Sequence, residues 1–146
     1  MAKTIKKAAA GAALGATAVP AVLVDTCAWI DFLRNAQGDL GDQVAQLIST
    51  GRARLCGVVA AELLQGVKTP KEAAQLQMLL DRVPSLPTVD ADWAMAGKKL
   101  QTLRAKGITL PLTDALIWAV AQRHGAVVLT VDKHFMHLDV SGANTS

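Results

Sequence analysis

The sequence predicts a single α/β domain whose central sheet is mostly parallel. Along the 146 residues, short apolar runs alternate with stretches of helical periodicity, which is typical of strand–helix–strand units. The runs are apolar throughout, as in AVLV at 21–24, and strands covered on both faces have this composition. Hydrophobic residues make up 51% of the chain, which allows one sizeable core and argues against disorder.

The expected elements follow one another in order. Strands are expected at 21–24, 54–56, 86–89 and 127–130, with a further candidate at 137–140. A helix follows the first strand, and helical patterns occupy 41–51, 59–66, 71–83, the stripe of Trp93, Ala96, Leu100 and Leu103, and 112–124. Gly51, Gly66 and Gly125 end three of these helices, and Thr113 is the expected N-cap of the last. The stripe that begins with Trp93 is expected to face the core.

The first twenty residues, MAKTIKKAAAGAALGATAVP, differ from the rest. Three lysines and an Ala/Gly-rich run imitate a secretory signal, but its middle has Leu14 as the only large apolar residue. We therefore expect a flexible basic extension at 1–20, a domain at 21–140 and a tail at 141–146, in a cytoplasmic protein with no membrane span. A misassigned start and a weak export signal are the alternatives for the extension.

Charge and composition exclude several classes of protein. Lys3, Lys6 and Lys7 account for the net charge of +3, and the remaining 12 basic and 12 acidic residues cancel. The charge of the domain is therefore no evidence for nucleic-acid binding. Five aromatic residues and no Tyr argue against a base-stacking RNA module. Two cysteines, Cys27 and Cys56, suggest reduced thiols, and their spacing suggests neither a disulfide framework nor zinc.

Four of the twelve acidic residues occupy unusual places. Asp25 ends the first strand, Glu62 lies in the apolar string VVAAELL after the second, Asp114 begins an apolar helix, and Asp132 follows VVLT. Each alone could belong to a turn, a cap or an exposed surface. Together, at the carboxyl edge of a parallel sheet, they would repel one another unless a cation neutralised them. Carboxylates without His or Cys favour Mg²⁺ or Mn²⁺, which suits phosphoryl chemistry.

At this point the sequence resembles a known family. VDTCAWIDFLR, AAELLQGV and LTDALIWAVAQRHGAVVLTVDKHF are similar, in order and spacing, to the motif blocks of PIN-domain ribonucleases, and in particular of VapC-type toxins. The similarity runs from about Ala21 to Leu138. It implies a three-layer α/β/α fold and Mg²⁺- or Mn²⁺-dependent endoribonuclease activity. An antitoxin partner that occupies the site and a homodimer are further expectations.

The resemblance also implies roles for individual residues. Asp25, Glu62, Asp114 and Asp132 would be the catalytic, metal-binding acids, with the hydroxyls of Thr26 and Thr130 behind them. Cys27 stands where the family often has Ser, which leaves its part in metal or phosphate contacts open. His134 is expected to position a loop or to contact phosphate. Candidates for binding the RNA phosphates, with solvated surface charge as the alternative for each, are Arg34, Lys98, Lys99 and Lys133.

Rival readings lack their motifs. A haloacid-dehalogenase-like phosphatase needs a second Asp where Cys27 stands, and a receiver domain needs adjacent acids at the first strand. Neither G-x-x-x-x-G-K-[ST] nor a strand-linked G-x-G-x-x-G occurs in the sequence. The alternative from another class is a non-catalytic RNA- or protein-binding module on the same fold, against which the four acids argue.

Overall fold

The computed structural model describes residues 19–34 and 38–140. The expected tail at 141–146, and all but the last two residues of the expected extension at 1–20, lie outside these ranges. No helix within the described ranges is long and apolar enough to cross a membrane.

Four short parallel strands form the central sheet. They are β1 (Val22–Val24), β2 (Ala53–Cys56), β3 (Ser85–Leu86) and β4 (Val127–Leu129), in the order β3-β2-β1-β4. Val22 pairs with Ala53 on one side and with Val127 on the other, so β1 is central. All three residues of β1 are buried, as an apolar run without alternation predicts. The predicted α/β class with a parallel sheet is confirmed.

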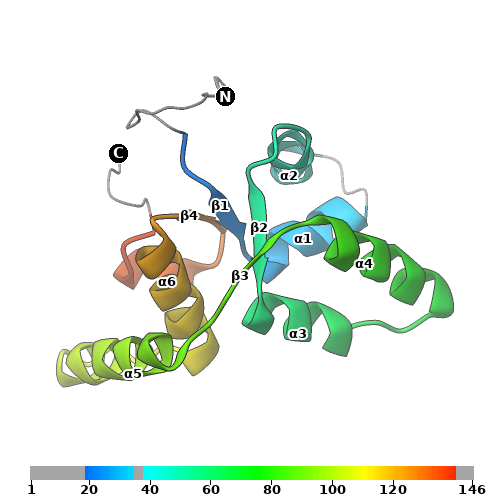
Figure 1. Cartoon of the computed structure of the whole chain (residues 1–146). Helices are drawn as coiled ribbons and strands as arrows, with labels where there is room; N and C mark the ends of the chain where they lie inside the picture. Colours follow the sequence, from blue (N-terminus) through cyan, green and yellow to red (C-terminus); the bar gives the residue numbers. More distant parts are fainter. Residues whose placement is uncertain (1–18, 35–37, 141–146) are drawn as a thin grey trace.

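Six α-helices surround these strands. Their bounds are α1 (Thr26–Leu33), α2 (Asp39–Ser49), α3 (Gly57–Gln65), α4 (Pro70–Arg82), α5 (Asp90–Ala105) and α6 (Leu112–His124). Figure 1 shows α5 and α6 together on the left of the strands, and α1, α3 and α4 on the right. The helices therefore form layers on either side of the sheet, as a three-layer α/β/α fold requires.

Helix α6 is the most deeply buried helix of the domain. Eight successive residues, from Asp114 to Ala121, are buried, so the helix has no solvated face over two turns. A helix that is apolar all round can only be stable inside a core. It ends at Gly125, whose φ of 66° is left-handed, whereas α2 ends with Thr50 as its C-cap and Gly51 follows with a left-handed φ of 73°. Gly66 is the C-cap of α3, so the predicted ends at Gly66 and Gly125 are confirmed, while Gly51 lies one residue beyond the cap of α2.

Four local predictions are wrong. Residues 137–140 form no strand: His137 ends a 3-10 helix, η2 (Lys133–His137), and the residues after it are tied to β4 by the bond from the Val128 N–H to the Val140 carbonyl, at 2.9 Å. The third strand stops at Leu86, before Pro87, since proline has no N–H to donate to a ladder. Thr113 lies within α6, and Pro111 is the capping residue. Trp93 is 51% exposed, whereas Ala96 and Leu103 of the same stripe are buried.

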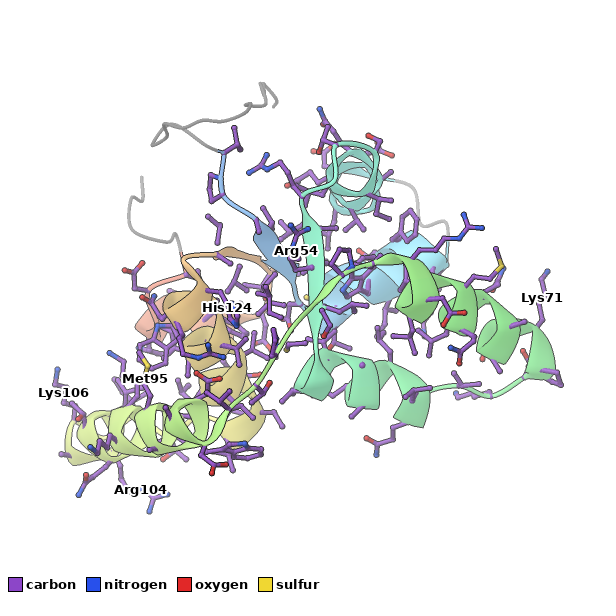
Figure 2. All side chains as sticks on the ribbon, viewed as in Figure 1. Arg54, Lys71, Met95, Arg104, Lys106 and His124 are labelled. Carbon is purple, nitrogen blue, oxygen red and sulfur yellow. The ribbon has the colours of Figure 1, made fainter. Side chains whose placement is uncertain are left out.

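One ion pair, between a buried aspartate and a more exposed arginine, joins α5 to α6. Asp92 is 1% exposed, and its two carboxylate oxygens accept from Arg123 Nε at 2.8 Å and Arg123 Nη2 at 3.0 Å. The Val89 N–H also donates to Asp92 at 2.9 Å, and Arg123 Nη2 donates to the Pro87 carbonyl at 2.7 Å. The neighbouring residue His124, at the end of α6 in Figure 2, lies 3.1 Å from the same carbonyl. The guanidinium of Arg123 holds the pKa of Asp92 below its ordinary value.

Candidate metal-binding active site

Asp25 stands where the central strand becomes a helix. Its backbone N–H donates to the Leu129 carbonyl of β4 at 3.0 Å, which continues the sheet by one residue. One oxygen of its side chain, Oδ1, accepts the Thr26 N–H at 2.8 Å and so caps the first turn of α1. The residue is 5% exposed. Its burial is thus partly balanced by the free N–H groups at the start of α1.

The second oxygen of Asp25 faces the end of β4. Thr130 Oγ1 donates to Asp25 Oδ2 at 2.7 Å, and the same hydroxyl accepts the Asp132 N–H at 2.9 Å. The Cys27 thiol donates to Asp25 Oδ2 at 3.5 Å and lies 3.8 Å from the Thr130 hydroxyl. Burial raises the pKa of Cys27, which keeps the thiol protonated and able to donate. Thr130 therefore connects the first predicted acid to the fourth.

Glu62 lies on α3, opposite the first turn of α1. Thr26 Oγ1 donates to Glu62 Oε1 at 2.6 Å, and both residues are half-buried. Thr26 therefore links two acids, because its N–H binds Asp25 while its hydroxyl binds Glu62. Both predicted hydroxyl residues, Thr26 and Thr130, are bonded to predicted acids.

Asp114 lies in the first turn of α6 and is 8% exposed. His134 Nδ1 lies 2.8 Å from Asp114 Oδ2 and 3.3 Å from Asp132 Oδ1, and Asp132 Oδ1 accepts the His134 N–H at 2.9 Å. Burial raises the pKa of Asp114, and the charges of Asp132 and Asp25 raise it further, while the hydrogen bond with His134 opposes them. The expectation for His134 was a loop or phosphate contact, and its contact with Asp114 was not foreseen.

The donor set fits a divalent cation. Ligand atoms of Asp114, Asp132 and His134 all lie within 4.8 Å of one another. Within 19–34 and 38–140, the ion pairs of Asp114 and Asp132 are with His134 and not with Lys or Arg. Metal ligands are expected to be carboxylates that lie close together with no Lys or Arg to neutralise them. The charge of Asp25 raises the pKa of Asp114, and Glu62 is linked to Asp25 by the two hydrogen bonds that Thr26 donates.

The candidate RNA-binding cations occupy three places. Lys99 Nζ lies 5.2 Å from the ring centroid of Trp118, which follows Asp114 by one turn of α6. The exposed side chain of Lys98 lies beside it on α5, and Lys133 begins the 3-10 helix that carries His134. Arg34 lies elsewhere, at a cavity of about 460 Å³ that Glu62 also lines. The apolar part of the cavity comes from α1, α3 and α4 and includes Leu33, Leu63 and Leu76.

This fold and this site define a class of protein. The family model for the PIN domain matches residues 22–140. A VapC ribonuclease of Mycobacterium bovis is 33% identical over 118 residues, which cover 78% of this chain and 88% of that protein. Ribonuclease VapC11 of Mycobacterium tuberculosis is similar to the same extent. The chain therefore belongs to the PIN-domain family, within its VapC branch.

Solved structures support the same fold. DNA-bound VapBC from Salmonella typhimurium is similar with a TM-score of 0.69 at 20% identity, covering 85% of this chain and 95% of that one. VapBC2 from Rickettsia felis, bound to a DNA fragment from its promoter, has a TM-score of 0.67 at 17% identity and covers 80% of this chain and 92% of that one. At these identities the likeness concerns the arrangement of helices and strands.

Proposed function

We propose that this protein is a metal-dependent endoribonuclease that acts as the toxin of a toxin–antitoxin pair. The observation that carries the proposal is the cluster of Asp114, Asp132 and His134 at the carboxyl edge of the sheet, where burial and the charges of Asp132 and Asp25 raise the pKa of Asp114. The relatives that are 33% identical are named ribonucleases, and the match covers most of both chains. A structural role alone gives no reason to collect these charges.

Asp25, Glu62, Asp114 and Asp132 are the proposed catalytic and metal-binding residues. A divalent cation bound there would activate water and stabilise the charge that develops on a phosphodiester. Thr130 and the Thr26 N–H fix both oxygens of Asp25, and the Thr26 hydroxyl orients Glu62. Such hydrogen bonds behind the ligands restrict them to one arrangement. The metal is Mg²⁺ or Mn²⁺, because most of the donors are carboxylate oxygens.

The substrate is RNA, and its phosphates require cations near the acids. Lys99 and Lys98 on α5 and Lys133 on the 3-10 helix flank the elements that carry Asp114 and Asp132, and Arg34 is the fourth candidate. Sequencing of RNA ends after induced expression would identify the RNA and the cleavage site. Replacement of Lys99 should weaken RNA binding, whereas replacement of the exposed Lys106, at the far end of α5 (Figure 2), should not.

Catalysis is tested with Asp25→Asn. The variant keeps the size of the side chain but loses the charge, so RNA cleavage in Mg²⁺ or Mn²⁺ should fall by roughly a thousandfold. Asp90→Asn, at an exposed position in the first turn of α5, is the control and should cleave like the wild type. Equal cleavage by Asp25→Asn and the wild type would contradict the proposal. Metal-independent RNA binding without cleavage would support the alternative, a non-catalytic binding module.

The partner is an antitoxin, and the proposed assembly contains a homodimer of this chain. The apolar cavity leads to Glu62, so a bound apolar segment would lie beside one of the proposed ligands. A small reading frame just upstream, encoding a DNA-binding protein with a hydrophobic tail, would be the first support. Co-expression of its product should abolish cleavage, and light scattering of this chain alone should give twice the mass of 15.3 kDa.

A further inference from the structure

His134 is held in place independently of its imidazole. Its N–H donates to Asp132 Oδ1 at 2.9 Å, and the next N–H, of Phe135, donates to the Asp132 carbonyl at 3.1 Å. Phe135 is 3% exposed and fixes the 3-10 helix to the core. The backbone contacts alone would therefore position this loop. The imidazole is thus not needed to hold the loop, and its Nδ1 contacts Asp114 and Asp132 instead.

The position of Nδ1 matches that of a ligand. It lies 2.8 Å from Asp114 Oδ2 and 3.3 Å from Asp132 Oδ1. Neighbouring ligands of an octahedral ion with bonds of about 2.1 Å are separated by roughly 3 Å. Both distances from Nδ1 are thus those of adjacent ligands of one ion, and the three ligand atoms, all within 4.8 Å of one another, come from α6, the end of β4 and the 3-10 helix.

We propose that His134 supplies a nitrogen ligand, through Nδ1, to the cation that Asp114 and Asp132 bind, and that the site therefore prefers Mn²⁺ to Mg²⁺. The inference rests on the proposed function and names its metal more closely. Mg²⁺ prefers an all-oxygen environment, whereas imidazole nitrogen is a good ligand for transition metals. Ligation uses the neutral ring with its proton on Nε2. The side chain is 47% exposed, so water can solvate the ring from the outer side.

Spectroscopy of the unmodified protein tests the ligand directly. The full-length chain loaded with Mn²⁺ should show ¹⁴N coupling of a coordinated imidazole in pulsed electron paramagnetic resonance. The chain has three histidines, and His134 is the one in contact with the proposed site. The signal should therefore disappear in His134→Ala and persist in His137→Ala, a replacement in the same 3-10 helix. Bound Mn²⁺ without ¹⁴N coupling would overturn the inference.

Calorimetry tests the selectivity. Titration of Mn²⁺ and Mg²⁺ into the wild type should give a lower Kd for Mn²⁺, and His134→Ala should reduce this preference about tenfold. His137→Ala should leave it unchanged. A wild type that binds both ions with equal affinity, or a preference unaltered in His134→Ala, contradicts the inference but leaves the proposed function intact. A wild type that binds neither ion contradicts both.

Discussion

Two buried aspartates, Asp92 and Asp114, lie in the first turns of adjacent helices and differ in what neutralises them. Asp92 is 1% exposed and is held by both arms of the Arg123 guanidinium, and its pKa is lowered. Asp114 is 8% exposed, and its ion-pair partner among the described residues is His134. Burial and the nearby carboxylates raise its pKa. A carboxylate that serves folding thus receives a cation from its own chain, and one without such a cation indicates a ligand site.

The largest expected difference is between Asn substitutions at these two positions. Asp114→Asn should reduce RNA cleavage by roughly a thousandfold, because a charged ligand is lost. Its melting temperature in EDTA should equal or exceed that of the wild type, since a buried, repelled charge is removed. Asp92→Asn should melt at a lower temperature yet, while folded, cleave within about threefold of the wild type. Cleavage assays at a temperature below both transitions separate the two effects.

Arg123→Ala should destabilise the fold without altering the proposed metal-binding site. Loss of the guanidinium leaves Asp92 buried without a cation and the Pro87 carbonyl without a donor, so the melting temperature should fall by about 5–10 °C. The matched control is Arg104→Ala, since the Arg104 side chain projects from the end of α5 (Figure 2). A melting temperature unchanged in Arg123→Ala would show that the ion pair contributes little, and the contrast with Asp114 would lose its basis.

The sequence predicts Asp114 as unusual but not Asp92, and the reason is physical. Asp114 precedes ALIWAVA, so the adjacent sequence already indicates burial. Asp92 lies in DADWAM, which is typical of an exposed helix start, and it becomes buried because Arg123 meets it from 31 residues away. The contact of His134 with Asp114 is likewise between residues 20 positions apart. Periodicity describes one segment at a time and carries no information on such pairs.

The same limit explains the fold predictions. The strands and helices that depend on local apolar runs are found close to their expected bounds, with α6 at Leu112–His124 as expected. The strand candidate at 137–140 is wrong, and its first residue belongs to a 3-10 helix because the Asp132 carboxylate and carbonyl accept the N–H groups of His134 and Phe135. Trp93 has the spacing of a core residue, and its exposure depends on which elements pack on α5.

As the pH falls, Asp92 and Asp114 should change the stability of the fold in opposite directions. Arg123 holds the pKa of Asp92 below its ordinary 3.8, so this stabilisation is present above pH 3.8 and is lost as the pH falls through the lowered pKa. The pKa of Asp114 is raised above 3.8, so the folded protein gains stability as the pH falls from neutral through that raised pKa. Urea unfolding in EDTA from about pH 3 to pH 7 measures both. Asp114→Asn should remove the gain in stability at falling pH, and Asp92→Asn should remove the loss of stability at acid pH.

The smallest expected effect is that of Cys27→Ser, which replaces the thiol beside Asp25 by a hydroxyl. Asp25 Oδ2 already accepts a short bond of 2.7 Å from Thr130, and the thiol adds a longer one of 3.5 Å. A serine hydroxyl is a stronger donor to the same oxygen, but Thr130 already orients the carboxylate. Cleavage and metal affinity of Cys27→Ser should therefore stay within about threefold of the wild type. Thr130→Val, which removes the short bond, should cost at least tenfold in either quantity. If Cys27→Ser had the larger effect, the thiol and not Thr130 would be the group that holds Asp25 in place.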